Sequence, residues 1–191
     1  MDRLIQKWRF AAASSVLPEG SRLLDIGAHK GDFLTYLGPR IEPSVGIDPE
    51  TEVDCAVGRH QLLGGYFPER TPAGCFDAAS LLAVVEHLDD AALAAVGKAL
   101  ASAVRPNGRV IVTLPSPSAD GILDVMQRIG MIDGMDLDAH RHLTVEGLVD
   151  SWSKCGLHCL RQRRFEFGLN NLVVFEVIGG SAPTRIEENP C

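Results

Sequence analysis

A turn containing two glycines carries the residues best suited to bind a small ligand. It reads Asp25-Ile-Gly-Ala-His-Lys-Gly31 and follows a short apolar run. Gly27 and Gly31 permit a tight turn and a close approach of the backbone to a ligand. Seventeen residues after Gly31, Asp48 ends a second apolar run. A carboxylate there can accept hydrogen bonds from both hydroxyls of a ribose, so the pattern predicts a site for an adenosine-type cofactor.

The spacing of the glycines distinguishes two kinds of cofactor. A dinucleotide-binding turn has the pattern G-x-G-x-x-G and places a helix N-terminus against pyrophosphate. Here the pattern is D-x-G-x-x-x-G, with Asp25 two residues before the first glycine. A carboxylate facing the loop repels pyrophosphate but suits the ammonium and sulfonium groups of S-adenosylmethionine (SAM). The turn therefore favours SAM, and the alternative is an ordinary strand-to-helix turn without a ligand.

Histidines are the candidate bases for transfer to a hydroxyl or an amine. Such a transfer needs alignment of the acceptor and then removal of its proton, and histidine is the usual base near neutral pH. His87 follows an expected strand, although it would serve equally well as a helix-entry residue bonded to backbone. His140, and less strongly His142, lie in a segment that would border an acceptor. Four neighbours would line an apolar pocket or belong to the core: Met126, Met131, Ile132 and Met135.

Alternating strands and helices must position these residues. Apolar periodicity and turn signals predict strands at 22–27, 45–48, 76–83, 109–114, 157–166 and 171–178. The same signals predict helices at 1–17, 31–38, 89–104 and 144–155, with a helix and a loop at 120–142. The stretch 50–70 is expected to hold a weak helix and a strand near 61–66. The alternation implies a doubly wound, mostly parallel sheet, and the turn Gly168-Leu-Asn-Asn171 makes the last strand antiparallel.

Composition narrows the class of protein. The 191 residues suit one domain, taken as 1–180, with a polar tail at 181–191 that is expected to be disordered. A net charge of −7 argues against nucleic acid as a partner, and no apolar run is long enough to span a membrane. Five cysteines without a CxxC pair indicate a reduced, cytoplasmic protein. A metal held by Cys155 and Cys159 would lack four converging ligands.

Four motifs, taken in order, resemble those of one enzyme family. They are Leu24-Asp-Ile-Gly-Ala-His-Lys-Gly31, Gly46-Ile-Asp48, Phe76-Asp77 with Val85-Glu-His-Leu88, and Arg105-Pro-Asn-Gly108 within Leu100 to Val112. The series resembles class I SAM-dependent methyltransferases, in particular the ubiquinone-biosynthesis-like O-methyltransferase branch. The resemblance covers about residues 20–115. It implies an α/β, Rossmann-like, doubly wound sheet of seven mostly parallel strands with an antiparallel C-terminal hairpin strand.

The resemblance also implies a role for individual residues. Asp25, Gly27 and Gly31 would line the methionine part of SAM, and Asp48 would hold the ribose. The full expected cofactor set is Asp25, Gly27, Ala28, His29, Gly31, Asp48, Pro49, Gly65, Tyr66 and Leu82, with Gly65 or Tyr66 beside the adenine and Leu82 near the adenosine. Many members have glycine where His29 stands, and some place a metal-binding acid where this chain has Ala83. No metal is therefore predicted.

The expected function is transfer of a methyl group from SAM to an oxygen or nitrogen atom, with S-adenosylhomocysteine (SAH) as the product. The acceptor would be a small molecule or a sugar- or lipid-linked molecule, with His87 or His140 as the catalytic residue. A non-catalytic SAM- or SAH-binding module that serves a partner enzyme is the main alternative, and an NAD-dependent oxidoreductase is a weaker one. The N-terminal helix with Trp8 and Arg9 is either a lid over the cofactor or a packing helix. A homodimer is left open.

Overall fold

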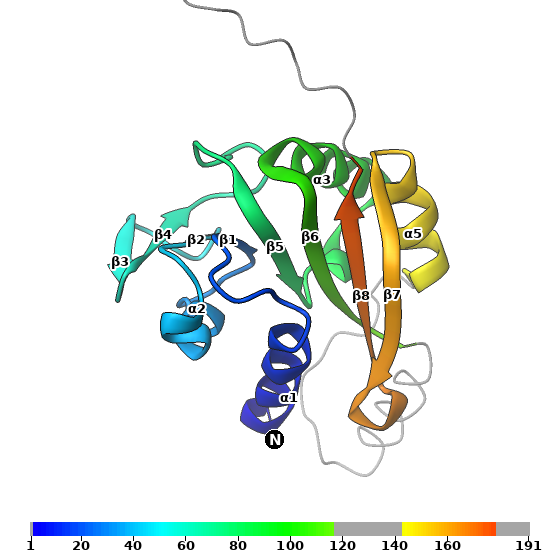
Figure 1. Cartoon of the computed structure of the whole chain (residues 1–191), viewed down its shortest axis with the longest axis horizontal. Coiled ribbons are helices and arrows are strands. Elements are labelled where there is room, and N and C mark those ends of the chain that lie inside the picture. Colours follow the sequence, from blue (N-terminus) through cyan, green and yellow to red (C-terminus); the bar gives the residue numbers. More distant parts are fainter. Residues whose placement is uncertain (1, 117–142, 179–191) are drawn as a thin grey trace, which may run out of the picture.

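The computed structural model describes residues 2–116 and 143–178 (Figure 1). The expected helix and loop at 120–142, with His140 and His142, lie outside the described residues, as does the tail 181–191. The helices are α1 (Asp2–Ser14), α2 (Asp32–Leu37), α3 (Asp90–Ala103) and α5 (Val145–Ser153), with 3-10 turns η1 (Gly38–Arg40), η2 (Val85–His87) and η4 (Glu166–Gly168). The strands are β1 (Leu23–Ile26), β2 (Val45–Asp48), β3 (Cys55–Val57), β4 (His60–Gly64), β5 (Phe76–Leu82), β6 (Val104–Pro115), β7 (Leu157–Phe165) and β8 (Asn170–Val177).

Within the described residues, all strands join one sheet in the order β3-β4-β2-β1-β5-β6-β8-β7. β4, β2, β1, β5 and β6 run parallel, whereas β8 pairs antiparallel with both β6 and β7. The predicted Rossmann-like class and the antiparallel C-terminal hairpin are therefore confirmed. The chain moves outward from β1 to β2 and β4 and then returns to β5 on the other side of β1. This reversal makes the ends of β1 and β5 the expected place for a ligand.

The stretch 50–70 matches its prediction in part. The strand expected near 61–66 is present as β4, but the stretch holds no helix. Instead β3 pairs with β4 in an antiparallel hairpin, which adds an eighth strand within the described part of the chain. Gly58, at a φ of 59°, supplies the left-handed conformation that the turn between Val57 and His60 requires. The side chains of β3 are largely exposed, so the stretch lacks the apolar periodicity that would have revealed a strand.

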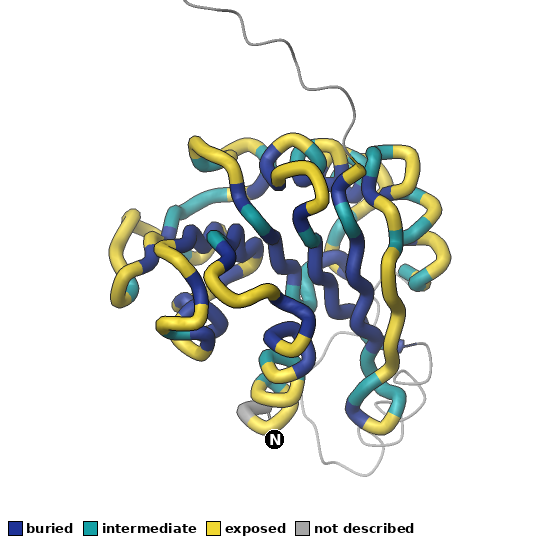
Figure 2. The backbone as a smooth tube through the Cα atoms, in the orientation of Figure 1, coloured by how far each residue is buried: buried dark blue, intermediate teal, exposed yellow. Residues whose placement is uncertain are grey.

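Two hydrophobic layers enclose the sheet. Leu23 and Leu24 are consecutive residues of β1, so their side chains point to opposite faces of the sheet. Leu23 belongs to one layer and Leu24 to the other. α1 and α2 cover the face of Leu23, and α3 and α5 cover the face of Leu24. Figure 2 shows the central strands buried, while β7 at the edge is exposed over most of its length. The ligand site therefore sits at the rim of a well-packed sheet.

Helix boundaries follow local hydrogen bonds that the sequence predicts. The Asp89 side chain accepts the backbone N–H of Ala92 at 2.8 Å where α3 begins. The Thr144 hydroxyl accepts the N–H of Gly147 at 3.1 Å where α5 begins. Both are standard N-caps, so the predicted starts of these helices are confirmed to within one residue.

Gly46 of β2 leaves room for the turn that follows β1. A Cβ atom at this position would lie 2.5 Å from Cδ2 of Leu62 and 2.6 Å from Cβ of Ala28. Because Ala28 belongs to the turn after β1, the missing side chain lets the turn pack directly on the neighbouring strand. In contrast, Cβ at Gly147 in α5 would meet Oγ1 of Thr144 at an ordinary 3.4 Å.

We expect Gly46→Ala to lower the free energy of unfolding by about 1–3 kcal/mol, because the added methyl group would push Ala28 of the turn after β1 and Leu62 of β4 away from β2. The matched change Gly147→Ala should leave stability unchanged or raise it by up to about 1 kcal/mol, since alanine favours a helix. Urea denaturation followed by circular dichroism measures both values. Equal stability of the two variants would contradict the packing argument.

Candidate functional site

A cavity of about 210 Å³ lies where the chain leaves β1 and β5. The turn after β1 supplies Gly27, Ala28 and His29, and the end of β5 supplies Leu82. Asp25 of β1 also lines it. The structure therefore brings five of the ten expected cofactor residues to one cavity, at the reversal of strand order.

Asp25 is a buried carboxyl at the end of β1. Only 3% of the residue is exposed, and the Ser80 hydroxyl donates a hydrogen bond of 2.6 Å to its Oδ1. Ser80 is its direct neighbour on β5. Burial raises the pKa of Asp25 to about 7, the hydrogen bond from Ser80 opposes that rise, and the nearby Asp48 adds to it. Because the carboxylate is poorly solvated, a cationic ligand group beside it would be bound favourably.

The backbone holds Asp48 in place at the end of β2. Its Oδ2 accepts the N–H of His29 at 2.7 Å, and its Oδ1 accepts the N–H of Glu50 at 2.9 Å. Each carboxylate oxygen can accept a further hydrogen bond. The two N–H groups therefore fix the orientation of the Asp48 carboxylate and leave each oxygen able to accept another hydrogen bond. A residue that binds ribose hydroxyls needs both properties.

The turn after β1 depends on unusual backbone angles. Gly27 and Gly31 have φ values of 74° and 76°, in the left-handed region that favours glycine. A Cβ on Gly27 would also lie 2.5 Å from Cγ2 of Val84. His29 adopts a φ of 47°, which is costly for a residue with a side chain. Its N–H bond to Asp48 holds it there.

The His29 imidazole lies between two acidic side chains. Nδ1 is 3.8 Å from Oδ2 of Asp32, and Nε2 is 3.6 Å from Oε2 of Glu50. The imidazole also borders the cavity and is half exposed. These contacts favour a role in shaping the cavity.

The remaining expected cofactor residues lie beside the cavity and do not line it. Gly31 packs near Leu62, and Pro49 follows Asp48 at the surface. Gly65 donates its N–H to the backbone oxygen of Asp48 at 3.2 Å. Tyr66 is 69% exposed. An adenine wall formed by Gly65 or Tyr66 would therefore adjoin Asp48, outside the cavity.

Of the two predicted catalytic histidines, the structure describes only His87, which does not line the cavity. His87 is exposed in η2, just after the loop that follows β5, and its N–H bonds to the oxygen of Val84. His140 lies outside the described residues. The sequence predicted that His87 follows the strand 76–83, and it does follow β5. Its position along the chain does not reveal the direction in which the short 3-10 turn orients its side chain.

Three residues of α1 border the cavity, although the expected cofactor set contains none of them. Gln6, Arg9 and Phe10 line the cavity from the side facing the turn. The three residues are spaced so that they share one face of a helix, and this spacing is the sequence signal that could have grouped them. The Nε of Arg9 is buried and has no hydrogen-bond partner among the described residues. Sequence alone offered Arg9 only as part of a lid or a packing helix.

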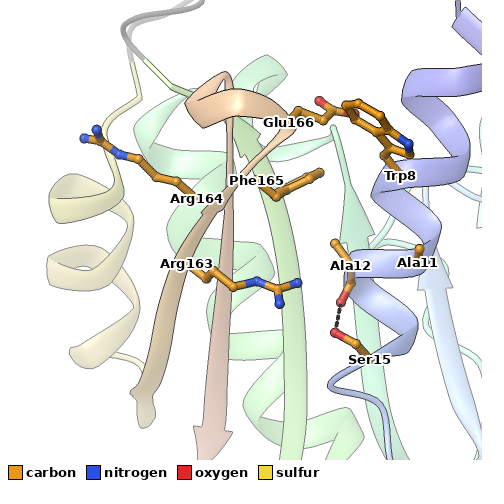
Figure 3. A pocket seen from close by; sticks show the side chains of 8 residues that line it. All are labelled: Trp8, Ala11, Ala12, Ser15, Arg163, Arg164, Phe165 and Glu166. Atoms are coloured by element: carbon orange, nitrogen blue, oxygen red, sulfur yellow. Dashed lines mark hydrogen bonds between the residues drawn. The ribbon is translucent and has the colours of Figure 1, made fainter.

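A second cavity of about 480 Å³ separates α1 from β7 (Figure 3). α1 and the residue after it contribute Trp8, Ala11, Ala12 and Ser15 to its lining. The end of β7 and the first residue of η4 contribute Arg163, Arg164, Phe165 and Glu166. It contains none of the expected cofactor residues, so the smaller cavity is the better cofactor site although the other is larger.

Residues 2–116 and 143–178 contain no group of three His, Cys, Asp or Glu side chains that could hold a metal ion. Over the same ranges, no helix has the length and apolar character needed to cross a membrane.

A family model described as a methyltransferase domain matches residues 1–162. No curated protein matches the sequence. The fold is similar to that of the pyocyanin biosynthetic protein PhzM, with a TM-score of 0.70 and 20% identity over 90% of this chain and 55% of PhzM. The chain thus spans about half the length of PhzM.

Two further structures match more of their own length. A SAM-dependent methyltransferase from Clostridium acetobutylicum ATCC 824 has a TM-score of 0.66 and 12% identity, over 91% of this chain and 92% of that one. Burkholderia thailandensis 1,6-didemethyltoxoflavin-N1-methyltransferase, with bound 1,6-didemethyltoxoflavin and SAH, has a TM-score of 0.66 and 14% identity, over 90% and 77%. At these identities the likeness shows the fold.

We expect Asp25→Asn to stabilise the folded protein progressively as the pH rises. The pKa of Asp25 is raised from 3.8 to about 7 on folding, so its contribution to stability is complete below pH 3.8 and is lost as the pH approaches 7. The loss is on the order of 4 kcal/mol, and asparagine avoids it because it does not ionise. Urea denaturation of both proteins between pH 5 and 8 tests this, and a difference that stays constant with pH would refute it.

Proposed function

The chain belongs to the family of class I SAM-dependent methyltransferase domains, and we propose that it methylates an oxygen or nitrogen atom of a small-molecule, sugar- or lipid-linked acceptor. The observation that carries the proposal is the pair of buried carboxyls, Asp25 and Asp48, at the ends of the adjacent strands β1 and β2. Asp25 lines the smaller cavity, and Asp48 accepts the N–H of His29, which also lines it. SAM, its methyl donor, supplies an electrophilic methyl group on a sulfonium. An acceptor oxygen or nitrogen needs only alignment and loss of its proton.

The residues at the cavity fit the parts of SAM. We propose that Asp48 binds the ribose hydroxyls, since both of its oxygens are oriented and retain acceptor capacity. Asp25 on one wall and Arg9 on another offer opposite charges to the ammonium and carboxylate of the amino-acid end. The unpartnered Nε of Arg9 supports this assignment, because a buried donor without an acceptor is costly.

The other expected residues complete this proposal. Gly27, Ala28, His29 and Gly31 form the turn around the methionine part, and Leu82 packs beside the adenosine. Pro49, Gly65 and Tyr66 adjoin Asp48 and would border the adenine. His87 and His140 are proposed as acceptor contacts. His87 is supported by its place just after the loop that follows β5.

A non-catalytic SAM- or SAH-binding module is the second candidate. The observation in its favour is that, among the described residues, His29 is the one histidine that lines the cavity, and it lies between two acids. An oxidoreductase is less well supported, because the turn lacks the third glycine of a dinucleotide site. We further propose a reduced, cytoplasmic setting for the protein, on the grounds of its cysteine usage.

We expect Asp48→Ala to weaken SAH binding by about 10- to 100-fold, since hydrogen bonds to a charged acceptor are lost. Glu52 is exposed and carries the same charge as Asp48, so the control variant Glu52→Ala should bind SAH as the wild-type protein does. Isothermal calorimetry with SAH, SAM and NAD measures these affinities, and circular dichroism confirms folding. Tight binding of NAD without binding of SAM would contradict the proposed function.

A further inference from the structure

Glu166 is a buried carboxyl at the turn between β7 and β8. Only 9% of the residue is exposed, and its Oε1 has no hydrogen-bond partner among the described residues. Its Oε2 accepts a hydrogen bond from Nδ2 of Asn170. The side chain borders the larger cavity, next to Trp8 of α1 (Figure 3). A carboxylate oxygen deprived of both water and a donor is costly unless a ligand uses it.

The backbone around Glu166 is strained. Glu166 and Phe167 have φ values of 51° and 54°, both in the left-handed region that favours glycine. Such a conformation is costly for a residue with a side chain and persists only where its surroundings enforce it. Here Ser116, at the end of β6, enforces the turn. Its N–H bonds to the oxygen of Leu169 at 2.8 Å, and its hydroxyl bonds to the oxygen of Gly168 at 2.6 Å.

These contacts place Glu166 at the edge of the sheet that carries the cofactor site. Ser116 follows β6, whose parallel neighbour β5 ends at Leu82 in the smaller cavity. α1 borders both cavities, because Arg9 lines the smaller one and its neighbour Trp8 lines the larger one. A molecule in the larger cavity would therefore meet Glu166 on one side and, on the other, the helix that also borders the cofactor cavity.

We propose that Glu166 is a catalytic base that accepts the proton of the methyl acceptor, and that the larger cavity holds this acceptor. The inference rests on the proposed function. In the reaction a bond forms between the acceptor oxygen or nitrogen and the methyl carbon, while the carbon–sulfur bond breaks. The electron pair of the broken bond stays on sulfur, and the acceptor proton passes to Oε1 of Glu166.

The charges around Glu166 suit this role. Burial raises its pKa, while the hydrogen bond from Asn170 and the Arg9 cation lower it. Arg163 and Arg164 of β7 border the same cavity. A carboxyl whose pKa is raised is a stronger base than an ordinary glutamate. Transfer should therefore slow as the pH falls through this pKa.

The test compares Glu166→Gln, Glu166→Asp and His87→Gln with the wild-type protein. Catechol, 4-aminophenol and glucosamine serve as a phenol, an aromatic amine and a sugar acceptor, with SAH release as the readout between pH 5 and 9. Glu166→Gln should lower kcat by about 100-fold or more and abolish the acidic limb of the pH profile. SAH affinity by calorimetry should stay within about threefold of the wild-type value, since the residue is outside the cofactor cavity. Glu166→Asp should keep the acidic limb at a reduced rate.

The control is Glu176→Gln, the same chemical change on β8 away from both cavities, which should leave kcat unchanged. If the wild-type protein methylates a probe and Glu166→Gln does so equally fast, the base assignment alone is overturned. The same holds if His87→Gln is the variant that loses the acidic limb. If the wild-type protein binds no SAH, or methylates none of the three probes, the proposed function fails and the role of Glu166 fails with it.

Discussion

The site depends on holding two carboxyls at the ends of adjacent parallel strands without the water that would normally solvate them. Asp25 and Asp48 repel one another, and burial makes the ionised form of Asp25 costly. Backbone N–H groups of the two turns satisfy Asp48, and the Ser80 hydroxyl partly satisfies Asp25. The sheet ladder supplies the rigidity, because β1 is paired on both sides. A cationic cofactor would relieve the repulsion, so the same arrangement costs stability and favours binding.

Much of this arrangement is local in sequence and was therefore predictable. The turn from Asp25 to Gly31 and the strand Val45–Asp48 are short patterns in which glycine, proline and acidic residues have distinct physical effects. The caps Asp89 and Thr144 are local in the same sense. Their outcomes agree with the sequence because each depends on atoms only a few residues away.

What was missed depends on contacts between distant segments. The face of α1 that reaches the cavity is set by Phe10 packing on Phe33, with ring centroids 5.1 Å apart, and periodicity alone does not identify that partner. Glu166 resembled an ordinary residue before a hairpin, since its burial depends on Ser116 and Asn170. Strand β3 was not predicted because its side chains are largely exposed, whereas its partner β4 matches the strand expected near 61–66.

The order β6-β8-β7 also bears on how the protein folds. β8 is the last described strand in chain order, yet it lies between β6 and β7 in the sheet. It pairs with β6 from Arg109 opposite Glu176 to Pro115 opposite Asn170. Until β8 inserts, β7 has no hydrogen-bonded neighbour in the sheet. Such pairing between distant segments raises the contact order, and the loop-closure entropy must be overcome before the contacts form. The larger cavity, which the end of β7 borders, should therefore be among the last parts of the molecule to assemble during folding.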